Sequence, residues 1–138
     1  AVGISQLKKF NIIFKKHKKN KNIILKKIKK FKEIQIRDLP NNSIDASESL
    51  IFSLKNQNLA RKFRKIFFNK GYSTKILPEA LDWHFAGKWT HIKELNIKKS
   101  NSYKKSLKRI NKYVSLQIFY KMNDDYPKKI ESTLRQIL

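Results

Sequence analysis

Residues 7–31 read LKKFNIIFKKHKKNKNIILKKIKKF, and a stripe of mainly apolar side chains recurs there at every third or fourth position. The stripe consists of Leu7, Phe10, Phe14, His17, Lys21, Ile24, Ile28 and Phe31. This spacing predicts a long amphipathic helix. At 1.5 Å per residue the helix would run to about 45 Å, more than a compact domain of this size needs for itself. We therefore expect it to connect this part of the protein to another part.

A self-associating coiled coil is the alternative interpretation of the same helix. It is less favoured, because Lys21 lies on the seam and the heptads are few. A lysine at such a position can extend its ammonium group along the apolar surface to solvent.

Two strands and a helix are predicted next. Ile34 and Ile36 alternate with polar residues, as in a half-buried strand, residues 40–43 are typical of a turn, and residues 49–54 form the second strand. The helix that follows has Asn56 or Asn58 as its N-cap and Gly71 at the left-handed position after its end. Its apolar face consists of Leu59, Phe63, Ile66 and Phe67.

The rest of the chain alternates between strands and helices, apart from one irregular segment. Residues 72–77 are predicted to form a strand, whereas periodicity fails between Pro78 and Leu95. A helix over residues 103–110 and a strand over residues 114–120 come next. Asn123 then caps a last helix, whose first turn contains Asp124, Asp125 and Pro127 and whose buried stripe is Tyr126, Ile130, Leu134 and Ile137.

This order of elements predicts the α+β class, with helices on one face of a small, mainly antiparallel sheet. We expect residues 1–32 to form the long connecting helix and residues 33–138 to form one C-terminal small domain. The chain begins with Ala1 rather than methionine, which suggests a fragment or a processed chain.

The net charge of +23 suggests an acidic partner such as nucleic acid. Of the 33 basic residues, however, only Arg37, Arg61, Arg64, Arg109 and Arg135 are arginines, which leaves 28 lysines spread along the chain. Because base and phosphate recognition relies on the planar arginine group, solvated lysine-rich faces are favoured over a dedicated surface. A lysine-rich, non-specific nucleic-acid-binding domain remains the alternative function.

Composition and motifs exclude several classes of site. Cysteine is absent, so there are no disulfides, thiolate metal sites or cysteine nucleophiles. The three glycines, Gly3, Gly71 and Gly87, cannot form a Gly-rich phosphate loop, and no common hydrolase or metalloprotease motif occurs. No run approaches the ~20 apolar residues of a membrane span, so we expect no membrane association and a cytoplasmic location.

The most informative stretch is LPEALDWHFAGKWTH, residues 77–91, which holds both tryptophans. Asp82, His84 and His91 would allow a metal site, but no third ligand has a recognisable spacing. Trp83 and Trp89 fit equally well as core aromatics of a packed loop or as ligand contacts on a rigid scaffold.

Three stretches together resemble the C-terminal part of one enzyme family, the DegT-type sugar aminotransferases. Residues 78–87, PEALDWHFAG, resemble the small-domain loop in which a histidine faces the active site. Residues 1–7, AVGISQL, resemble the start of the family's long inter-domain helix, and residues 115–125, SLQIFYKMNDD, resemble its closing strand and acidic helix start. The three occur in the family's order.

The resemblance implies a homodimeric fold-type-I enzyme that uses pyridoxal phosphate. The cofactor would be bound by a lysine of a large domain upstream of Ala1, so no residue of this chain is assigned a catalytic, cofactor-binding or metal-binding role. The intact enzyme would transfer an amino group, with glutamate as the expected donor, to a keto sugar in amino-sugar, lipopolysaccharide or other cell-surface polysaccharide synthesis. By the same resemblance, His84, Trp83 and Lys88 would bind the substrate, and the chain alone would be inactive.

Overall fold

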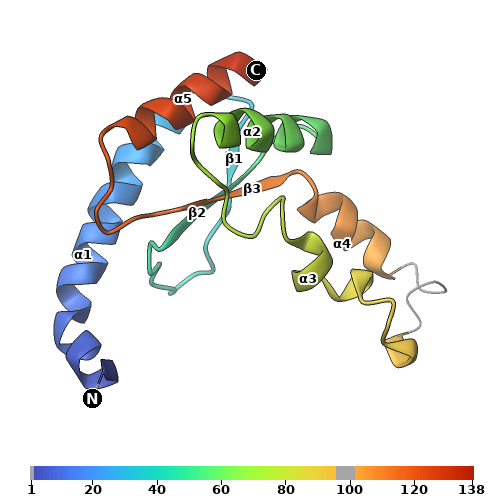
Figure 1. Cartoon of the computed structure of the whole chain (residues 1–138), viewed down its shortest axis with the longest axis horizontal. Helices are drawn as coiled ribbons and strands as arrows, with labels where there is room; N and C mark the ends of the chain where they lie inside the picture. Colours follow the sequence, from blue (N-terminus) through green and yellow to red (C-terminus); the bar gives the residue numbers. More distant parts are fainter. Residues whose placement is uncertain (1, 96–101) are drawn as a thin grey trace.

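The chain forms five α-helices, two short 3-10 helices and three strands within the residues described by its computed structural model, 2–95 and 102–138 (Figure 1). Ala1, the first residue of the stretch that resembles the inter-domain helix, lies outside them. The elements are α1 (Val2–Ile28), β1 (Gln35–Ile36), β2 (Ser49–Ser53), α2 (Gln57–Asn69), α3 (Leu81–His84), η1 (Ala86–Lys88), η2 (Lys93–Leu95), α4 (Ser102–Ile110), β3 (Tyr113–Gln117) and α5 (Asp125–Ile137).

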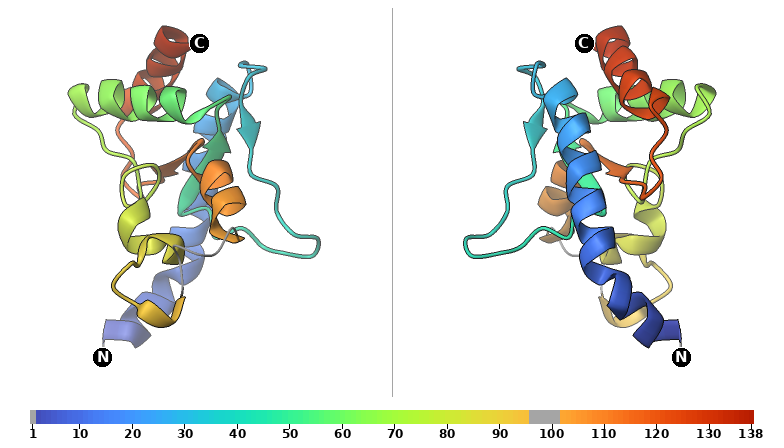
Figure 2. Two further views of the ribbon diagram at one scale, coloured as in Figure 1. Left: turned by 90° about the vertical axis from the view of Figure 1, so that its right-hand side faces the viewer. Right: turned by 90° about the vertical axis from the view of Figure 1, so that its left-hand side faces the viewer.

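The sheet is antiparallel throughout, in the order β1-β2-β3. Leu50 pairs with Leu116, and Phe52 with Val114, so that these four side chains occupy one face. All four are buried in one core together with apolar side chains of α1, α2 and α5. Figure 2 shows the loop between β1 and β2 on the side away from α2. The α+β class and the small antiparallel sheet with helices on one face are therefore confirmed.

Aromatic rings form the centre of this core. Phe67 of α2 lies 5.3 Å from Phe63, 5.4 Å from Tyr72 and 5.7 Å from Tyr126 of α5, measured between ring centroids. Tyr126 also donates a hydrogen bond of 2.9 Å to the carbonyl of Gln117. The phenol is thus satisfied inside an apolar site, and α5 is attached to the end of β3.

Both ends of α2 follow from local sequence. The Asn56 side chain accepts the amide of Leu59 at 3.0 Å, as expected of an N-cap. At the other end Gly71 has φ of 85°, its amide donates to Phe68, and the amide of Tyr72 donates to Phe67. These two bonds are those of a Schellman motif, which confirms the predicted role of Gly71.

The predicted strand over residues 72–77 is wrong, because Ile76 has φ of 64° and breaks the extended conformation. The segment still lies beside β3, since the amide of Lys75 donates to Ser115 at 2.7 Å and the amide of Ser115 donates to Leu77 at 3.0 Å. These contacts bury Ser115, a residue expected on the outer face of its strand. The strand predicted over residues 114–120 also ends early, at Gln117.

The long first helix is confirmed, but its two halves differ. Ile24 and Ile28 are buried in the core, whereas Leu7 is 73% and Phe10 is 57% exposed. In Figure 1 the first half of α1 extends away from the sheet. Lys21 forms an ion pair with Asp45 in the loop between β1 and β2. The division into a connecting helix of residues 1–32 and a small domain of residues 33–138 stays a prediction. Among the described helices, none is long and apolar enough to cross a bilayer.

Glu131 on α5 links the end of α1 to the core. Its carboxylate accepts from Lys27 at 2.9 Å and from Arg135 at 2.8 Å. These hydrogen bonds, that of Lys27 first, lower the pKa of Glu131 from 4.5 to about 2. A carboxyl group with a lowered pKa in the folded state stabilises the fold above its unfolded pKa, and the contribution is lost as the pH falls towards the folded value.

Glu131→Gln is therefore expected to destabilise the chain by about 1 kcal/mol at pH 6, given two charge-assisted bonds near solvent. The difference from the unmodified chain should disappear as the pH falls from about 4.5 to 2. Urea unfolding at several pH values measures it. Glu33→Gln removes the same charge from an exposed position and is the control. A loss that does not change with pH would contradict the assignment.

Candidate functional site

The segment predicted to be irregular, residues 78–95, folds into three short helical turns, α3, η1 and η2, without a strand. The indole nitrogen of Trp89 donates to the carbonyl of Trp83 at 3.1 Å and so connects α3 to the turn after η1. Trp89 is half-buried. The segment is therefore held by its own hydrogen bonds, as a small packed unit beside α4 (Figure 1).

Gly87 fixes this unit on α4. A Cβ atom at this position would lie 2.5 Å from Cε1 of Phe85 and 2.8 Å from Cβ of Tyr103, closer than real contacts allow. The rings of Phe85 and Tyr103 pack edge to face, with centroids 6.1 Å apart. Only glycine permits this approach without a shift, so the sequence element around Gly87 positions the loop that carries Trp83 and His84.

Trp83 and His84 lie next to each other on α3 and both are exposed. Trp83 has 81% of its surface exposed, so the interpretation of this residue as a core aromatic is wrong. An exposed tryptophan on an anchored turn suits contact with another molecule or domain. The structure thus brings two of the three predicted substrate-binding residues together on one accessible turn.

Lys88 lies at a different place, on a cavity of about 300 Å³ between the loop and α2. The cavity also contains Arg61 and Glu79, and Glu79 is ion-paired with Arg64 of α2. Trp83 and His84 are not among its lining residues, which are Gln57, Arg61, Pro78, Glu79, Leu81, Lys88 and Asn111. The predicted trio is therefore not a single cluster in this chain.

The possible metal site receives no support from the geometry. Among the side chains that the structure describes, no three histidine or carboxylate groups are close enough together to hold one ion. The imidazoles of His84 and His91 are both exposed.

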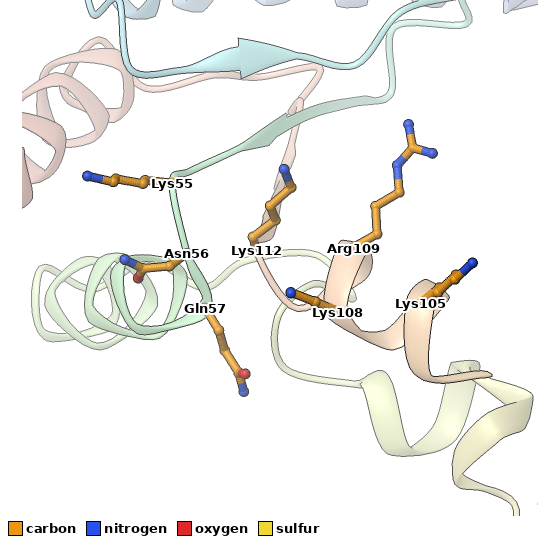
Figure 3. Close-up of a pocket in the computed structure, with 7 residues that line it drawn as sticks. All are labelled: Lys55, Asn56, Gln57, Lys105, Lys108, Arg109 and Lys112. Carbon is orange, nitrogen blue, oxygen red and sulfur yellow. The ribbon is translucent and has the colours of Figure 1, made fainter. Parts of the chain in front are cut away.

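Sequence reasoning missed a second, larger cavity. It has a volume of about 740 Å³ and lies between the start of α2 and the helix α4 (Figure 3). Five of its seven lining residues are cationic; the seven are Lys55, Asn56, Gln57, Lys105, Lys108, Arg109 and Lys112. We call this cavity the basic pocket.

One signal in the sequence could have located half of the basic pocket. Lys105, Lys108, Arg109 and Lys112 are spaced i, i+3, i+4 and i+7, which puts four cations on one side of a helix and the turn after it. No pattern indicates that Lys55, at the end of β2, lies on the other side of the cavity. The sequence was also compared with models of known protein families, and none matches.

Proposed function

We propose that this chain is the C-terminal part of a pyridoxal-phosphate-dependent sugar aminotransferase. The observation that carries the proposal is the division of α1 into a buried end and an exposed apolar half, which includes Leu7 and Phe10. An apolar helix face of this kind calls for a partner surface. In an inter-domain helix, the large cofactor-binding domain would provide that surface.

The loop supports the same proposal. Trp83 and His84 are exposed on α3, and α3 is anchored through Gly87 and Phe85 to α4. A rigid turn of this kind can contribute side chains to a pocket whose other wall is a second domain. In that arrangement His84 would hydrogen-bond the sugar or pair with an anionic group of the substrate, and Trp83 would cover an apolar face. Lys88 would act from the adjacent cavity.

The described residues do not fit a cofactor site of their own. Lys21 is engaged with Asp45. Lys70, whose pKa is lowered by burial and by Lys129, donates to the hydroxyls of Ser132 and Thr133 on α5. Neither arrangement leaves an amine to hold pyridoxal phosphate, which acts as an electron sink when bound. We therefore assign the cofactor to the large domain, and to this chain the binding and orientation of the substrate.

The complete enzyme, on this proposal, is a cytoplasmic homodimer. It takes an amino group from a donor such as glutamate and transfers it to a keto sugar for amino-sugar or cell-surface polysaccharide synthesis. The coding DNA upstream of Ala1 tests the proposal directly. A large domain with a cofactor-binding lysine is expected there, and an upstream region without one would end the proposal.

The chain by itself is expected to form no stoichiometric Schiff base with pyridoxal phosphate and to catalyse no transamination. Incubation with one equivalent of cofactor, borohydride reduction and peptide mass spectrometry would measure this. Only scattered, substoichiometric labelling of exposed lysines is expected. Full labelling of one lysine, together with turnover, would contradict the division of labour proposed here.

In the complete enzyme, His84→Ala is expected to raise KM for the keto sugar about tenfold with little change in kcat, as the loss of one charge-assisted hydrogen bond would. His91→Ala, a second exposed histidine of the same segment, is the matched control. Steady-state kinetics with varied sugar distinguish the two variants. Equal effects of both substitutions on KM would rule out a specific role for His84.

A further inference from the structure

We propose that the basic pocket binds a small soluble ligand through an oligophosphate group, that is, two or more linked phosphates. This inference does not depend on the aminotransferase proposal, because it rests on the side chains around one cavity. It assigns a ligand class to a site that the substrate-binding residues His84, Trp83 and Lys88 do not share.

The first argument is the charge of the basic pocket. Five cations line it, no carboxylate does, and within residues 2–95 and 102–138 none of the five makes an ion pair. The overall charge of the chain does not account for this, since other cavities combine both signs. The cavity beside Lys88 includes Glu79, the one beside Lys21 includes Asp45, and the one beside Arg37 includes Asp45 and Glu48. An anion in the basic pocket would supply the missing opposite charge.

The second argument is the arrangement of these cations around a cavity. Four of them come from α4 and the turn after it, and Lys55 comes from the end of β2 (Figure 3). In the figure, Lys108 and Lys112 lie between the body of α4 and the start of α2. A ligand here would be contacted from two sides, and several lysines need several anionic oxygens. Two or more linked phosphates satisfy that requirement better than one carboxylate.

The third argument separates a compact oligophosphate from a nucleic acid. Single strands are bound by stacking bases on aromatic side chains beside a basic groove. No aromatic side chain is among the seven residues that line the basic pocket. Its volume of about 740 Å³ lies in the range of small-molecule sites, about 300–1,000 Å³. The positive end of the α2 dipole, next to Asn56 and Gln57, has the same sign as the side chains.

Inorganic pyrophosphate and tripolyphosphate are suitable probes. Isothermal titration of the chain at 150 mM salt is expected to show one saturable site for each, with tighter binding of tripolyphosphate. Lys105→Gln with Lys108→Gln should weaken pyrophosphate binding at least tenfold. Lys8→Gln with Lys9→Gln removes the same charge from exposed positions on the first half of α1 and should change it less than twofold. Far-UV circular dichroism checks that both double variants remain folded.

Three results would overturn the proposal. The first is the absence of saturable binding of either probe at this salt concentration. The second is equal weakening by the two double variants, which would indicate only the net charge of the chain. The third is binding of a twelve-nucleotide single strand that tripolyphosphate does not displace, which would identify a nucleic-acid surface instead. Because the titration uses this chain alone, failure here leaves the aminotransferase proposal intact, and failure of that proposal leaves this one intact.

Discussion

Phe67→Ala is expected to destabilise the chain by about 3–5 kcal/mol, the usual loss when a fully buried phenylalanine is removed. The side chain is 0% exposed and contacts the rings of Phe63, Tyr72 and Tyr126. Its removal would leave a cavity at the junction of α2 and α5. Since small domains have a total stability of about 5–15 kcal/mol, the change should shift the midpoint of thermal or urea unfolding strongly.

The next residue provides the matched control. Phe68 is 56% exposed, and its main contact is the guanidinium of Arg64, which lies 4.8 Å from the ring centroid. Phe68→Ala should therefore destabilise the chain by about 1 kcal/mol or less. Equal losses for the two adjacent substitutions would show that the helix face assigned to the core is wrong.

Asn20→Asp is the second substitution with a large expected effect, about 3 kcal/mol or more. The side chain is 4% exposed, and its amide nitrogen donates to the carbonyls of Phe119 at 2.7 Å and Tyr120 at 3.2 Å. An aspartate would place a carboxylate against two carbonyl oxygens in a site closed to water. Part of the stability should return at low pH, where the protonated acid can donate one bond.

Asn22→Asp is the control, since it introduces the same charge at an exposed position of the same helix. It should change stability by no more than about 0.5 kcal/mol. Urea unfolding at pH 7 and pH 4 compares the two variants. If Asn20→Asp were tolerated like Asn22→Asp, the attachment of α1 to the segment after β3 would not be as described, and the orientation of the exposed helix half would lose its support.

The candidate site was only partly predictable. The turn that carries Trp83 and His84 is marked by composition, because both tryptophans and two of the three histidines crowd into residues 77–91. The separation of Lys88 from this pair depends on how η1 turns towards α2, which no spacing rule describes. The basic pocket depends on Lys55 and α4, two parts of the chain about 50 residues apart that the fold of the sheet brings together.

Local rules were sufficient wherever the partner of a group lies within a few residues. Asn56 caps α2, Gly71 ends it, and the apolar periods identify the core faces of α2 and α5, because each of these depends on hydrogen bonds or side-chain periodicity inside one element. Tertiary contacts determined the rest. Ser115 is buried by a neighbouring segment, and the stripe of α1 is covered only at Ile24 and Ile28. An amphipathic pattern states that a face is apolar, but burial of that face requires a second surface, which only the folded chain or its partner provides.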